Sequence, residues 1–72
     1  MAETRLQCLS SESAQAVAAE ADLPGKHHRA RAEGSTVVLA YLDKRYPLDV
    51  AEWAFTHGHA EDSAAAAVIG GL

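Results

Sequence analysis

The sequence contains only one cysteine, Cys8, among its 72 residues. A disulfide within the chain is therefore excluded, and so is a metal site built mainly from thiolates. A lone cysteine is typical of a reducing compartment, where thiols stay free. Because Met1–Gln7 is polar and lacks the apolar centre of a signal peptide, we expect a cytoplasmic protein.

Long apolar runs are also missing. The longest, Val37–Leu42 and Ala64–Ile69, are far too short to cross a bilayer, so we expect no membrane partner. Ten acidic residues against six basic ones give a formal net charge of −4. Since nonspecific nucleic-acid binding depends on neutralising phosphates, this balance argues against a broad nucleic-acid surface but allows a local basic patch.

Bulky apolar side chains are scarce. Hydrophobic residues make up 49% of the chain, but sixteen of them are alanine, and there are only one tryptophan, one phenylalanine and two tyrosines. A chain of this length is close to the lower limit for a self-sufficient core. We therefore expect one small domain over residues 1–72, marginal alone or completed by a partner, with residues 1–9 as a flexible lead-in.

The stretch Ser35–Gly58 holds all four aromatic residues and most of the large aliphatic ones. The apolar spacing within Ser35–Tyr46 predicts a helix, which ends before Pro47 because proline disfavours helical backbone in the preceding residue. Asp49 and Glu52 form a capping-box pattern that begins a second helix. Gly58 is suited to the left-handed position at its end.

Two further helices are predicted on either side. Ser10 and Ser11 are good caps for a helix over Ser13–Leu23, which Pro24-Gly25 would end. Ala64–Ile69 favours a short helix that needs docking, because isolated helices of this length are marginal in water.

Together these patterns predict a mainly α fold, a small bundle or orthogonal cluster of three to four short helices. The alternative is a small α+β domain in which Thr4–Leu9 pairs with Thr36–Leu42, because a short β-branched run is also typical of a buried strand. In the helical interpretation the expected core residues are Leu39, Leu42, Tyr46, Leu48, Trp53 and Phe55.

The only concentrated basic stretch is Lys26–Arg31, with the sequence KHHRAR. If Lys26–Ala32 is helical, it follows a supporting helix and a Pro-Gly turn in the manner of a helix-turn-helix recognition helix. The residues that would contact nucleic acid are then Lys26, His27, Arg29 and Arg31. The plainer interpretation is a solvated polar segment, which is what charge runs usually are.

No catalytic or cofactor site is indicated. Cys8 and the serines have no histidine and acid at a spacing that would activate a nucleophile. His27-His28 and His57-Gly58-His59 lack the i, i+4 spacing of helical metal ligands, and no pattern places them together. We therefore expect neither an enzyme nor a cofactor, a metal or a small-molecule substrate.

The leading hypothesis for function is a non-enzymatic regulatory or adaptor protein that binds a protein partner, including a second copy of itself. The aromatic side chains cannot all be buried among so many alanines, and exposed aromatics and arginines are the usual anchors of interfaces. The expected anchors are Tyr41, Trp53 and Phe55, with Arg29 and Arg31 as rim contacts. The alternative is a DNA-binding transcriptional regulator that uses the basic stretch.

Overall fold

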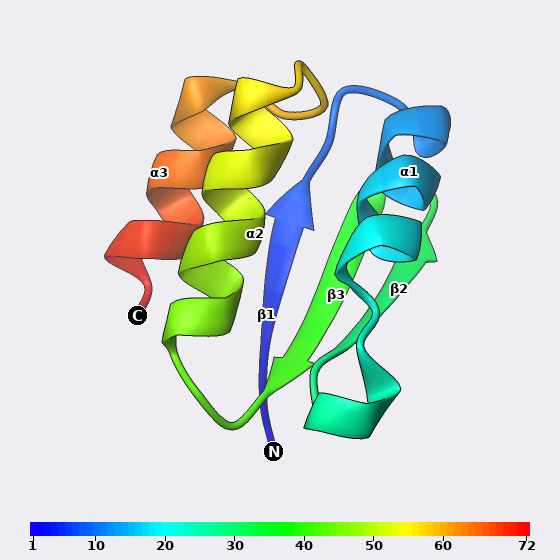
Figure 1. Cartoon of the computed structure of the whole chain (residues 1–72). Coiled ribbons are helices and arrows are strands. Elements are labelled where there is room, and N and C mark those ends of the chain that lie inside the picture. Colours follow the sequence, from blue (N-terminus) through cyan, green and yellow to red (C-terminus); the bar gives the residue numbers. More distant parts are fainter.

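One antiparallel three-stranded sheet, covered on a single face by three α-helices, forms the protein in a computed structural model that describes all 72 residues (Figure 1). The elements follow in the order β1 (Ala2–Gln7), α1 (Ser11–Ala21), a 3-10 turn η1 (Pro24–Lys26), β2 (Arg29–Glu33), β3 (Thr36–Tyr41), α2 (Arg45–Thr56) and α3 (Asp62–Gly70). The strand order is β1-β3-β2, so β3 is central. None of the helices has the length and hydropathy needed to cross a bilayer.

The prediction of a mainly α bundle is wrong, because Thr36–Tyr41 is the central strand and not a helix. The structure shows the α+β alternative, in which β1 pairs antiparallel with β3 and Leu6 lies opposite Val37. Most of the expected flexible lead-in is therefore part of the sheet. The outward residues of the central strand are Thr36, Val38 and Ala40, of which Val38 is buried, so its sequence lacks the polar and apolar alternation that marks a one-sided strand.

The basic stretch is not a recognition helix either. Arg29–Glu33 is a strand in which arginine and alanine alternate between the outer and inner faces of the sheet. Gly34-Ser35 is a two-residue hairpin loop that leads directly into β3. Gly34 has φ +63°, the left-handed backbone that such loops require.

Helix α1 is capped by Ser10 as predicted, but it spans Ser11–Ala21, so it begins and ends two residues before the predicted bounds. Ser10 is its N-cap, and the Ser10 hydroxyl accepts a hydrogen bond of 3.1 Å from the backbone N–H of Ser13. The inward face of α1 is almost entirely methyl groups, and the inward residues of β2 are Ala30 and Ala32. Small side chains on both elements let the helix lie close to the sheet. The buried residues of α1 are Ala14, Val17, Ala18 and Ala21.

Helix α2 begins a turn earlier than predicted. Its first residue is Arg45, so Pro47 lies in the first turn, where backbone N–H groups have no intrahelical partner to lose. The prediction of Asp49 as N-cap is wrong, because the N-cap is Lys44, which makes no side-chain capping bond. The carboxylate of Asp43, one residue earlier, accepts the backbone N–H of Arg45 over 2.9 Å. Gly58 follows the helix with φ +75°, as expected.

The core holds fewer of the large side chains than expected. Leu39 and Tyr46 are buried as predicted, but Leu42 is 68% exposed and Phe55 is 47% exposed. Leu48 and Trp53 are half-buried. Alanine methyl groups fill much of the space instead, because seven of the buried residues are alanines.

Candidate binding groove

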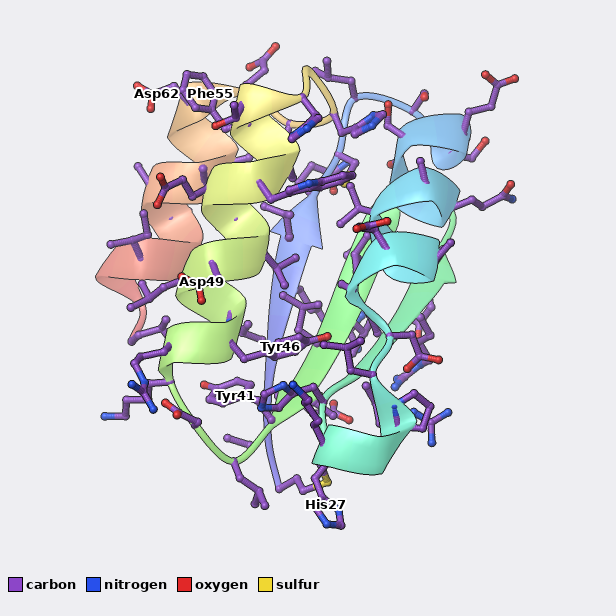
Figure 2. The ribbon with its side chains drawn as sticks, viewed as in Figure 1. His27, Tyr41, Tyr46, Asp49, Phe55 and Asp62 are labelled. Carbon is purple, nitrogen blue, oxygen red and sulfur yellow. The ribbon has the colours of Figure 1, made fainter.

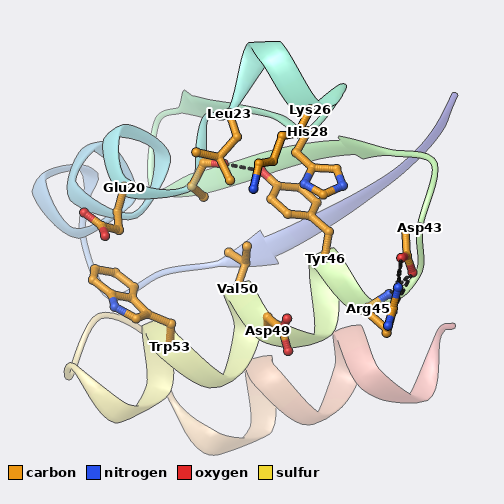
Figure 3. A pocket seen from close by; sticks show the side chains of 11 residues that line it. Glu20, Leu23, Lys26, His28, Asp43, Arg45, Tyr46, Asp49, Val50 and Trp53 are labelled. Atoms are coloured by element: carbon orange, nitrogen blue, oxygen red, sulfur yellow. Dashed lines mark hydrogen bonds and ion pairs between the residues drawn. The ribbon is translucent and has the colours of Figure 1, made fainter.

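A groove of about 470 Å³ lies between the end of α1 and η1 on one side and α2 on the other (Figure 3). Its volume is within the usual range of ligand sites. Leu23 and Val50 contribute apolar surface, and His28, Tyr46 and Trp53 contribute aromatic rings. The groove is therefore built by two helices that are separated in sequence by a turn and a hairpin.

The Tyr46 end of the groove is held by a hydrogen bond and an aromatic stack. The Tyr46 hydroxyl donates to the backbone oxygen of Ala21 over 2.7 Å. The ring of His28 stacks on that of Tyr46, with centroids 4.3 Å apart and planes 17° apart. Burial, together with the nearby carboxylate of Asp22, raises the pKa of Tyr46 to about 12, so the phenol remains a neutral donor near neutral pH.

A tight turn positions Lys26 and His28 over the groove. Leu23 and His28 exchange backbone hydrogen bonds of 2.7 and 3.3 Å, which close the loop around η1. His27 takes φ +60°, a left-handed conformation that is uncommon outside glycine. Figure 3 shows the Lys26 side chain reaching into the groove beside Tyr46. Lys26 makes no ion pair within the chain.

The other end of the groove is formed by the half-buried side chain of Trp53. Its indole stacks with His57, with centroids 4.3 Å apart, and with His59, at 5.6 Å. His57 Nδ1 donates to the Trp53 carbonyl oxygen over 2.9 Å, and His59 Nδ1 lies 3.2 Å from the hydroxyl of Ser13 on α1. Neither histidine lines the groove itself, but His57 lines an adjoining hollow that also borders Trp53.

The charges in the groove are only partly neutralised within the chain. Arg45 Nη2 lies 2.7 Å from Asp43 Oδ2, and hydrogen bonds from the guanidinium and backbone of Arg45 lower the pKa of Asp43 to about 2. Glu20 on α1 and Asp49 on α2 have no ion-pair partner. Figure 3 shows the Glu20 carboxylate near the Trp53 end. The groove therefore offers free carboxylates at that end.

The three predicted aromatic anchors lie in different environments. Tyr41 is only 7% exposed, because it occupies an inward position of β3, so it is unavailable as a surface anchor. Trp53 lines the groove. Phe55 is exposed but lies outside the groove, and Figure 2 shows it at the opposite end of the view from Tyr41.

The predicted basic contacts are divided between two faces of the molecule. Lys26 and His27 belong to the turn beside the groove. Arg29 and Arg31 project from β2 on the outer face of the sheet, and both are already paired with carboxylates. Arg29 Nε lies 2.9 Å from Asp22 Oδ1. The four predicted basic residues therefore do not lie on one helix that could contact nucleic acid.

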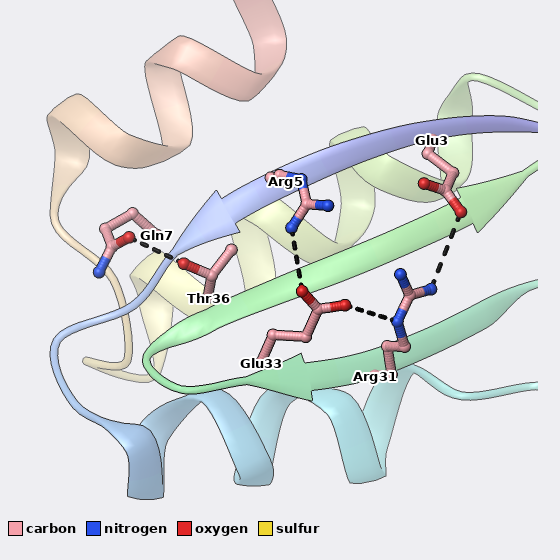
Figure 4. A network of polar contacts seen from close by, with 6 residues as sticks. All are labelled: Glu3, Arg5, Gln7, Arg31, Glu33 and Thr36. Carbon is pink, nitrogen blue, oxygen red and sulfur yellow. Dashed lines mark hydrogen bonds and ion pairs between the residues drawn. The ribbon is translucent and has the colours of Figure 1, made fainter.

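The outer sheet face carries a network of ion pairs (Figure 4). Glu33 accepts from Arg5 Nη1 over 3.3 Å and from Arg31 Nε over 2.8 Å, and Arg31 Nη1 lies 3.8 Å from Glu3. Val38 lies opposite both arginines in the register and is 1% exposed, although no helix covers this face. The aliphatic stems of neighbouring long side chains therefore cover Val38.

No metal centre is assembled by the fold, because no group of three or more histidine, cysteine, aspartate and glutamate side chains converges. Cys8 is a free, buried thiol, and burial raises its pKa above the usual value, which favours the unreactive protonated form. The groove has neither a serine nor a cysteine in its lining.

The sequence alone does not predict several of the residues that line the groove. Glu20 and Asp49 look like ordinary solvated helix charges, and His28 was grouped with the basic stretch. The position of His28 depends on its backbone bridge to Leu23, just before β2. The alternation of Arg29–Glu33 before Gly34-Ser35 was the local signal for the hairpin of β2 and β3.

Comparison with known proteins gives no independent guide to what the groove binds. No protein-family model, curated protein or solved structure matches the chain.

Proposed function

We propose that the protein is a small, non-enzymatic regulatory or adaptor protein that binds a segment of a protein partner in the groove between α1 and α2. The observation that carries this proposal is the half-buried indole of Trp53 in the wall of a concave groove. Leu23 and Val50 extend the apolar surface beside it. Tryptophan in such a setting is the residue type most often responsible for binding energy at protein interfaces.

The chemistry of the groove supports binding over catalysis. The Tyr46 hydroxyl is committed to Ala21, and the Asp43 carboxylate is committed to Arg45. An activated nucleophile needs a neighbouring base and an orienting group, and the lining supplies no serine or cysteine for that role. We therefore treat the remaining charged groups as recognition elements.

Photo-cross-linking from two exposed leucines tests this proposal. A photoreactive amino acid replaces Leu23, which lines the groove, or Leu42, which lies outside it and serves as the matched control. The Leu23 variant should form a protein adduct in an extract of the source cells, unchanged by nuclease, and the Leu42 variant should not. Equal adducts from both positions, or an adduct that nuclease removes, would contradict a protein-binding groove.

The proposal includes the cytoplasmic location expected from the sequence. The free and buried thiol of Cys8 is compatible with a reducing compartment. Fractionation of the source cells, followed by detection of the intact chain, checks this part separately.

A further inference from the structure

We infer that the Trp53 end of the groove takes an arginine or lysine side chain of the partner segment. This inference rests on the proposed function and adds the chemistry of the residue that the partner supplies. It is carried by the combination of one groove-lining indole with carboxylates from two helices, Glu20 and Asp49, that form no ion pair within the chain. The charge of Asp49 also acts on Arg45, where it adds to the larger effect of Asp43 in raising the pKa of that guanidinium.

The first step concerns where the net charge of −4 lies. Three arginines on the sheet side are paired with three acids, so that side is neutral, and the whole excess of negative charge lies on the helices and loops. The sheet-side groups are Arg5, Arg29, Arg31, Glu3, Asp22 and Glu33. The acids without an ion-pair partner are Glu12, Glu20, Asp49, Glu52, Glu61 and Asp62.

The second step concerns which of these acids share a surface with the indole. Glu20 from α1 and Asp49 from α2 line the groove together with Trp53. Glu52 and Asp49 line an adjoining hollow of about 300 Å³ that also borders Trp53. Three carboxylates that form no ion pair therefore border the two hollows that meet at one indole, and His57, which stacks on that indole, lines the second hollow with them.

The third step concerns the ligand that this arrangement recognises. A cation over an indole face is attracted by the ring quadrupole, and tryptophan is the strongest of the aromatic side chains in this respect. Glu20 and Asp49 add direct charge complementarity. An arginine fits best, because its planar guanidinium stacks on a ring and donates to carboxylates at the same time.

The remaining charged groups place the cation at the Trp53 end and not at the Tyr46 end. Lys26 and His28 lie at the Tyr46 end, where the free ammonium of Lys26 repels a second cation. Arg45 is neutralised there by Asp43. The two ends of the groove therefore differ in charge, and this difference orients the bound segment.

Nuclear magnetic resonance provides a direct test, because the single tryptophan gives one indole N–H signal. The probe is a blocked Gly-Arg-Gly-Arg-Gly peptide, and its neutral counterpart carries citrulline in place of arginine. The arginine peptide should move the Trp53 signal in a saturable way that weakens with salt. The citrulline peptide should bind at least about fivefold more weakly, because it has no positive charge.

Three charge-removing variants make the test specific. Glu20→Gln and Asp49→Asn should each weaken binding of the arginine peptide by about threefold, which is the usual scale of an exposed ion pair. Glu12→Gln removes an exposed, unpaired acid near the start of the same helix as Glu20, and it should change the affinity by less than about twofold. Thermal unfolding of each variant confirms that the fold is retained.

Three results would overturn the inference. They are the absence of any saturable shift, equal binding of the citrulline peptide, and a Glu12→Gln effect as large as that of Glu20→Gln, which would indicate attraction by net charge alone. If one of these results is obtained while the Leu23 variant still cross-links to a partner, the proposed binding groove is retained. The inference that the partner supplies an arginine or lysine is then rejected. If the cross-link is absent, the proposed function itself fails.

Discussion

The Tyr46 hydroxyl, on α2, donates a hydrogen bond of 2.7 Å to the carbonyl oxygen of Ala21, the last residue of α1. Carbonyl groups at the end of a helix have no intrahelical partner, so this bond satisfies one of them. It also joins the two walls of the groove at one point, and the ring of His28 packs on the same phenol. The shape of the groove therefore depends on Tyr46.

Replacing Tyr46 with phenylalanine should lower the free energy of unfolding by about 1–2 kcal/mol, because a buried carbonyl loses its donor. Urea denaturation measures this loss. Tyr41→Phe is the matched control, since the Tyr41 hydroxyl makes no hydrogen bond within the chain and is not a buried unpaired group, and it should be nearly neutral. Equal losses in the two variants would contradict the role of the Tyr46–Ala21 bond.

Alkaline pH should destabilise the protein through the same phenol. The pKa of Tyr46 is raised from 10.0 to about 12, so the folded state holds this proton more tightly than the unfolded chain. The resulting stabilisation is fully present below pH 10 and is lost as the pH rises through about 12. Urea midpoints across this range should fall less steeply for Tyr46→Phe than for the parent.

Cys8 also contributes to the loss of stability at alkaline pH, because burial raises the pKa of its thiol above the ordinary value. The comparison is therefore made with Cys8→Ala present in both proteins. If the urea midpoint falls with pH as steeply in Tyr46→Phe as in the parent, Tyr46 does not cause the alkaline loss of stability.

On the outer sheet face, packing should matter more than charge. Val38→Ala should cost about 1–2 kcal/mol of unfolding free energy, because it removes buried apolar groups under the arginine stems. Glu33→Gln should cost less than Val38→Ala, and added salt should reduce that cost, since its ion pairs are exposed. Chemical denaturation measures the free energy of unfolding of both variants. A larger loss in Glu33→Gln than in Val38→Ala would contradict this ranking.

Two glycines at helix ends should respond in opposite directions to alanine. Gly58 has φ +75°, so Gly58→Ala should destabilise the fold by about 1 kcal/mol. Gly70 is the last residue of α3, where an added Cβ meets no atom within 4 Å, so Gly70→Ala should stabilise the fold by about 0.5 kcal/mol. Thermal or urea unfolding of both variants checks the signs, and a change of the same sign in each would refute the assignment.

The parts of the fold that depend on local signals were predictable from the sequence. Ser10 as a helix cap and Gly58 as a left-handed helix stop follow from side-chain and backbone chemistry within a few residues. The helical prediction for Thr36–Tyr41 failed because apolar Val38 and Ala40 at outward positions of the central strand remove the period of two. The helical break predicted at Tyr46 failed because its buried ring and its bond to Ala21 hold it in the first turn of α2.

The groove was less predictable, because contacts distant in sequence create it. Trp53 was expected to be an anchor on grounds of residue type alone, and the same reasoning wrongly chose the buried Tyr41. The relevance of Glu20 and Asp49 depends on α1 and α2 lying on either side of the groove. No spacing within either helix indicates this relationship.

The most direct test of the central claim is the dissociation constant of the cross-linked partner for variants of two aromatic residues on α2, the half-buried Trp53 and the exposed Phe55. Trp53→Ala should weaken binding by at least about tenfold, because the anchor of the groove is lost, whereas Phe55→Ala should change it by less than about threefold. Circular dichroism should show both variants folded, and Trp53→Leu, which keeps apolar volume, should bind with intermediate affinity. Parent-like binding by Trp53→Ala, or a larger loss from Phe55→Ala, would contradict the groove as the binding site.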